Sequence, residues 1–156
     1  VFHEKENFNE LPQELNRLRT KPLWIKLPSY GQAKVEGLCG EPYESSKDLV
    51  LDLAKFSMDF GIDALTVGNS RSIKDLKMAT GTGGLSGKLL VEDTITMIKD
   101  LRKHVGDSIA INGCGGIFNA TDAERAINAG ATTIQVYSGL IYEGPEVAKR
   151  ISRLIG

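Results

Sequence analysis

Short apolar segments alternate with longer amphipathic segments along this chain, and this alternation constrains the fold more than any single motif. Each short segment is apolar or β-branched and ends at polar residues or glycine, which is typical of strands buried in a parallel sheet. These predicted strands are residues 23–27 (LWIKL), 64–67 (ALTV), 109–112 (IAIN) and 132–137 (TTIQVY).

Helical patterns lie between and around the predicted strands. Ser45 and Asp48 have the spacing of a capping box, and Thr121 and Glu124 have the same spacing further along the chain. Pro145 suits the first turn of a last helix. The predicted helices are residues 10–19, 46–60, 92–104, 121–130 and 145–154.

A helix followed by four strand–helix units predicts an α/β fold with a parallel sheet and right-handed crossovers. Two connections are long, residues 28–44 and 68–90, whereas the loops that enter the strands are short. Both long connections follow the carboxyl ends of strands, where α/β proteins bind ligands. We therefore expect the functional site at that edge of the sheet.

Composition excludes several classes of function. The 156 residues are a single-domain length, with 41% hydrophobic and 25% charged residues. A net charge of −1 gives no electrostatic reason to expect nucleic acid, and no apolar run is long enough for a membrane span. The two cysteines and two histidines have no metal-ligand or redox spacing, so no metal site is expected.

The segment ATGTGGLSGK, residues 79–88, ends like a nucleotide-binding P-loop. A P-loop requires Gly, four residues, and then Gly-Lys followed by Ser or Thr. Thr82 stands at the position of the first glycine and Leu89 at that of the hydroxyl residue, so the motif is absent. The segment is then either an exposed loop or one whose backbone closely approaches a flat ligand at Gly83, Gly84 and Gly87.

Glycine-rich turns follow the third and fourth predicted strands. They are residues 113–116 and 137–139, and the second turn leads into a short segment before the last helix. In (β/α)8 barrels a phosphate often lies between the loops of the last two strands, beside a short extra helix. This pattern predicts a phosphate site.

Polar residues also end the first two strands. Lys26 lies near the end of an apolar strand, and it either points into solvent or faces an anionic ligand. Asn69 and Ser70 end the second strand, where they would either recognise a planar polar ligand or act as local capping groups.

Four motifs together resemble the dihydroorotate dehydrogenase family: KLPSY, TGGLSGK, NGCGGI and IQVYSGLIYEGP, which begin at residues 26, 82, 112 and 134. The resemblance runs from about residue 20 to 156 and corresponds to the C-terminal half of that family. It implies an FMN-containing (β/α)8 barrel that oxidises dihydroorotate to orotate in pyrimidine biosynthesis. Residues 1–156 would then form one domain of about four βα units, completed by an N-terminal half.

The resemblance also implies a role for each motif residue. Lys26 would contact the flavin near N1 and O2, and Asn69 and Ser70 would hydrogen-bond the pyrimidine. Ser86 and Gly87 would lie along the flavin. The phosphate of FMN would be held by Gly115, Gly116, Tyr137 and Ser138.

The chain departs from the family pattern at several points, among them the longer stretch of residues 31–44 compared with the quinone-linked branch. Gly68 stands where many members carry a hydroxyl residue that helps to hold FMN, so one contact would be lost. The family's catalytic base, a Ser or Cys, belongs to the N-terminal half, and Cys39 and Cys114 lie in other loops. We therefore expect no catalytic base here and no activity from this chain alone.

Several alternatives stay open at this point. KLPSY resembles the fumarate- or NAD-linked branches and VYSGLIYEGP the quinone-linked branch, so the electron acceptor is open. The chain could instead belong to another FMN barrel acting on a related pyrimidine, or be a non-catalytic phosphate-binding half-barrel. We expect either a piece of a longer chain or a half-barrel that forms a homo-oligomer. The expected location is the cytoplasm, with peripheral membrane association if amphipathic helices precede Val1.

Overall fold

The computed structural model describes residues 13–30, 45–74 and 77–155, in which strands and helices alternate as expected. Residues 13–18 are helical. The strands are β1 (Trp24–Lys26), β2 (Ala64–Val67), β3 (Arg71–Lys74), β4 (Thr82–Leu85), β5 (Ala110–Cys114) and β6 (Thr133–Gln135). The helices are α2 (Ser46–Asp59), η1 (Lys88–Leu90), α3 (Val91–Val105), α4 (Ala120–Asn128), α5 (Ser138–Glu143) and α6 (Glu146–Ile155).

Four of the strands form one parallel sheet in the order β1-β2-β5-β6. Lys26 is in register with Thr66, Thr66 with Asn112, and Asn112 with Thr133, so these residues form a row across the sheet. The predicted four βα units and their parallel pairing are confirmed. Within the described residues no helix is long and apolar enough to cross a membrane.

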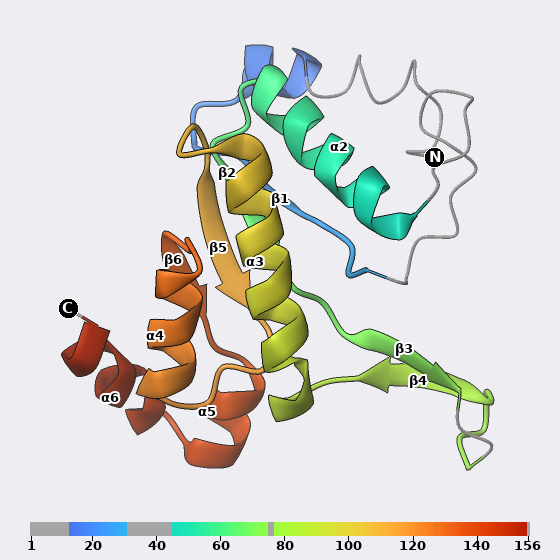
Figure 1. The fold of residues 1–156 in the computed structure, drawn as a ribbon, viewed down its shortest axis with the longest axis vertical. Coiled ribbons are helices and arrows are strands. Elements are labelled where there is room, and N and C mark those ends of the chain that lie inside the picture. The colour runs from blue at the N-terminus through green and yellow to red at the C-terminus, as the bar shows by residue number, and fades with distance from the viewer. Residues whose placement is uncertain (1–12, 31–44, 75–76, 156) are drawn as a thin grey trace.

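The helices α2, α3 and α4 lie along the same side of the sheet (Figure 1). Side chains of the central strands meet α3 in a core that excludes water: Leu65 and Ile111 from the sheet, and Ile98 and Leu101 from the helix, are fully buried. Burying each such side chain contributes about 1.5–3 kcal/mol. Alternate residues of each strand point to the opposite face, away from this core.

Of the two predicted capping boxes, the first is confirmed and the second is wrong. The Ser45 hydroxyl accepts a hydrogen bond from the backbone N–H of Asp48 at 3.2 Å and begins α2. Helix α4 begins earlier than predicted, because Asn119 has an extended backbone and its amide oxygen accepts from the N–H of Asp122 at 2.8 Å. Thr121 therefore lies inside the first turn.

The long connection after β2 contains an antiparallel hairpin, β3–β4, which extends away from the sheet (Figure 1). Gly83 and Gly84 both lie in β4, so this part of the segment is a strand and not a loop, and its approach to a flat ligand stays a prediction. A Cβ added at Gly83 would lie 2.8 Å from Cε of Met78, and one at Gly84 would lie 3.0 Å from Oγ of Ser70. These glycines make room for neighbouring side chains of the same connection.

Candidate functional site

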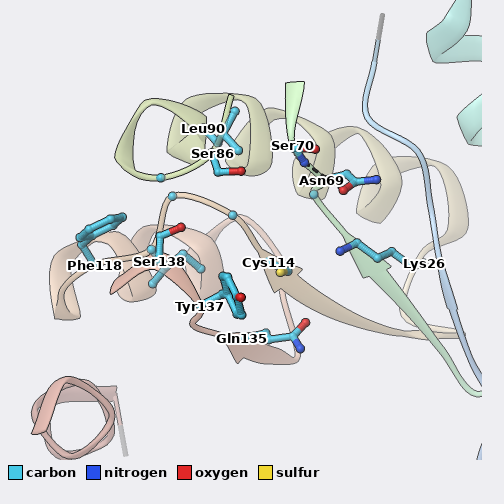
Figure 2. A pocket seen from close by; sticks show the side chains of 15 residues that line it. Lys26, Asn69, Ser70, Ser86, Leu90, Cys114, Phe118, Gln135, Tyr137 and Ser138 are labelled. Atoms are coloured by element: carbon cyan, nitrogen blue, oxygen red, sulfur yellow. Dashed lines mark hydrogen bonds between the residues drawn. The ribbon is translucent and has the colours of Figure 1, made fainter. Parts of the chain in front are cut away.

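A pocket of about 330 Å³ opens at the carboxyl ends of the parallel strands (Figure 2). It is formed by residues that lie more than 100 positions apart in the sequence, from β1 to α5. All of the site residues that the sequence suggested line this pocket: Lys26, Asn69, Ser70, Ser86, Gly87, Gly115, Gly116, Tyr137 and Ser138. Their roles toward a ligand stay predictions, but the structure brings them together.

Lys26 and Asn69 lie at one end of the pocket, where they are close neighbours in Figure 2. The backbone carbonyl of Asn69 accepts a hydrogen bond from the buried hydroxyl of Ser29 at 3.1 Å. The side-chain oxygen of Asn69 accepts from the N–H of Ser70 at 2.9 Å. Since both oxygens are engaged within the protein, Asn69 offers a ligand the donors of its amide group.

The turn after β5 forms the opposite end of the pocket, and glycine is required there for packing. Gly116 has a φ of +73°, and a Cβ on it would lie 2.6 Å from Cα of Val91 at the start of α3. The end of the turn is also fixed by Asp122, whose carboxylate accepts a hydrogen bond from the backbone N–H of Phe118 at 3.1 Å. Backbone at Gly115 and Gly116 therefore lines the pocket in a tightly supported conformation.

The turn after β6 lies beside this first turn. Ser138 begins α5, a six-residue helix, so the short segment expected between the last strand and the last helix is helical. The rings of Phe118 and Tyr142 join the two turns, with centroids 6.0 Å apart. In Figure 2, Ser138 lies beside Phe118, at the end of the pocket that is remote from Lys26.

The pocket also contains residues that the sequence did not single out as site residues: Gly68, Leu90, Cys114, Ile117, Phe118 and Gln135. Burial raises the pKa of the Cys114 thiol, and the nearby Lys26 ammonium opposes this shift. The period-2 alternation of β6 is the signal that could have located Gln135, because it shares a face with Thr133.

Gly68 is explained by packing. Its φ is +103°, and an added Cβ would overlap the carbonyl oxygen of Cys114 and lie 2.8 Å from the carbonyl carbon. The loops after β2 and β5 thus touch through their backbones at this point. The space that a hydroxyl side chain would need at position 68 is filled by the neighbouring strand end.

A four-stranded parallel sheet with helices on one side and a pocket at its carboxyl edge has the architecture of about half of a (β/α)8 barrel, and places the protein in that class. The family model for dihydroorotate dehydrogenase matches residues 4–156, and the chain belongs to that family.

Known proteins agree with this assignment. The dihydroorotate dehydrogenase (quinone) of Nitrosomonas eutropha is 34% identical over 163 residues, which cover 96% of this chain and 44% of the relative. That of Janthinobacterium sp. is 40% identical over 106 residues, covering 68% and 31%. A crystal structure of DHODH from Eimeria tenella in complex with ferulenol has a TM-score of 0.62 and 31% identity, covering 72% of this chain and 31% of that one. The chain therefore spans less than half the length of these relatives.

Proposed function

We propose that the protein to which this chain belongs oxidises dihydroorotate to orotate with FMN, in pyrimidine biosynthesis. One observation carries the proposal: four motifs that are scattered in the sequence contribute residues to a single pocket. Residues 1–156 would supply the C-terminal half of the barrel. The names of the relatives favour a quinone as electron acceptor.

The pocket residues fit FMN. Backbone at Gly115 and Gly116, where no Cβ can be accommodated, and the hydroxyl of Ser138 suit a phosphate. Lys26 at the opposite end suits the negative charge of a reduced flavin ring. When bound, FMN would supply the acceptor for a hydride.

The remaining pocket residues would contact either the flavin or the substrate. Ser86 and Gly87, which follow β4, would flank the flavin, and Tyr137 would close the phosphate end. Asn69 and Ser70 would hydrogen-bond the pyrimidine beside Lys26. The reaction also needs a base to remove a proton, which we expect from a segment other than residues 1–156.

The test uses the complete protein, purified and examined for flavin absorption and for dihydroorotate-dependent dye reduction. Lys26→Ala should lower flavin content and turnover, whereas the control Lys103→Ala, at an exposed position on α3, should change neither. Asn69→Ala should weaken orotate binding while FMN stays bound. Absence of both flavin and dihydroorotate oxidation in the wild type would refute the proposal, and turnover of uracil-type substrates alone would favour a related pyrimidine oxidoreductase.

A further inference from the structure

The face of the sheet turned away from the helices carries an unusual layer of polar side chains. Residues in register point to the same face, and the row Thr66, Asn112 and Thr133 lies opposite the face that packs on the helices. Gln135 follows two residues after Thr133 and shares this face. Thr66 and Asn112 are only 8% and 4% exposed.

Hydrogen bonds connect these four side chains across three strands. The amide nitrogen of Asn112 donates to Oγ1 of Thr66 and to Oε1 of Gln135, each at 3.3 Å. The amide oxygen of Asn112 accepts from Oγ1 of Thr133 at 3.0 Å. Both the nitrogen and the oxygen of the Asn112 side-chain amide are thus hydrogen-bonded, and residues of β2 and β6 determine the orientation of this amide.

Such a layer needs a physical reason. The interiors of (β/α)8 barrels are mostly filled by branched apolar side chains, which need no partners. A buried amide without hydrogen bonds costs about 2–7 kcal/mol, so a polar layer is tolerated only when it is well connected. The layer at Asn112 meets this requirement, and it ends in Gln135 at the pocket wall.

We propose that Gln135 is a further ligand-binding residue and that Asn112 positions it. Because Oε1 of Gln135 accepts from Asn112, the amide nitrogen of Gln135 is the group presented to a ligand. Gln135 lies below Cys114 and Lys26 in Figure 2, and all three residues line the pocket. Together with the ammonium group of Lys26, it makes this end of the pocket selective for a flat ring edge that carries hydrogen-bond acceptors.

This inference rests on the proposed function, since the ring edge would belong to the flavin. The experiment measures the binding of FMN and of riboflavin, which lacks the phosphate, to the flavin-free complete protein by flavin fluorescence quenching. Gln135→Leu keeps the side-chain size and removes the donor. This substitution should weaken the binding of FMN and of riboflavin by the same factor, about fivefold to tenfold for the loss of one hydrogen bond. Ser138→Ala should weaken the binding of FMN but not that of riboflavin, because the Ser138 hydroxyl would contact only the phosphate.

A double-mutant cycle separates positioning from packing. In the wild-type background, Asn112→Leu should weaken the binding of both flavins. In the Gln135→Leu background, it should change the flavin dissociation constants by less than about a further twofold. The control Ser57→Ala removes a buried hydroxyl that donates to Leu53 in α2, and it should leave flavin affinity unchanged. Should Asn112→Leu fail to fold, Thr133→Val, which removes the donor to the Asn112 oxygen, takes its place in the cycle.

The outcomes are distinct. If the wild type binds neither flavin, the proposed function fails. If the wild type binds and Gln135→Leu binds equally well, Gln135 is not a ligand-binding residue. If Gln135→Leu binds flavin weakly, and Asn112→Leu then lowers the flavin affinity by as large a factor in that background as in the wild type, Asn112 acts through the packing of the sheet. Its proposed positioning role is then wrong.

Discussion

Arg102, in the last turn of α3, is expected to be a main anchor of the sheet at the edge opposite the pocket. Its guanidinium donates to the carbonyl of Gly130 at 3.0 and 2.8 Å and to that of Ile109 at 3.2 Å. It also donates to the carbonyl of Gly106 and to Oγ1 of Thr132, the latter at 3.4 Å. One side chain thus joins the end of α3 to the loops that enter β5 and β6.

Replacing Arg102 by Met keeps most of the apolar stem and removes every one of these donors. A hydrogen bond from a charged group contributes about 1.5–3 kcal/mol, but the contributions of one group are not additive. The side chain is 19% exposed, so water recovers part of the loss. We expect Arg102→Met to lower the free energy of unfolding by about 3 kcal/mol, which at a urea m-value of about 2 kcal/mol/M lowers the midpoint by about 1.5 M.

The matched control is Arg125→Met on α4. Arg125 is 43% exposed and pairs with Glu92 at 2.7 Å, and surface pairs of this kind contribute less than about 1 kcal/mol. Urea unfolding of the complete protein, followed by circular dichroism, compares the two variants. Equal free energies of unfolding for Arg102→Met and Arg125→Met would refute the reasoning. The flavin affinity of both variants should equal that of the wild type, because the contacts of Arg102 and Arg125 lie away from the pocket.

Three further predictions concern the site and its support. Gly116→Ala should lower the free energy of unfolding by about 2–4 kcal/mol in urea titrations, because the new Cβ meets the start of α3 at a positive φ. Ser29→Ala removes the donor to the Asn69 carbonyl and should weaken orotate binding severalfold with FMN affinity unchanged; an equal loss of both would contradict it. The N–H of Leu23 is the main cause that lowers the pKa of Asp63, so ionised Asp63 stabilises the fold above about pH 4, and this contribution is lost as pH falls through the lowered pKa. The stability difference between wild type and Asp63→Asn should therefore shrink in urea titrations at acidic pH.

Local patterns located most of the secondary structure. The strand predicted at residues 64–67 is β2 with the same bounds, because its apolar side chains are buried on both faces. The strand predicted at 109–112 begins one residue later and continues to Cys114 as β5, since Gly113 pairs with Val67 of the neighbouring strand. The strand predicted at 132–137 is shorter, because the chain turns at Tyr137 to begin α5. The hairpin β3–β4 was missed because its glycines suggested a loop.

The sequence by itself determined the class of fold, the edge of the sheet that carries the site, and the motif residues that line the pocket. The fold class and the edge follow from periodicity and from turns, which depend on neighbouring residues, whereas the motif residues follow in part from the resemblance to a known family. Only the tertiary structure decided why Gly68 and Gly116 must lack side chains and how Asn112 orients Gln135. Those features depend on atoms from strands and helices that are distant in the sequence, and their contacts exist only once the sheet is assembled.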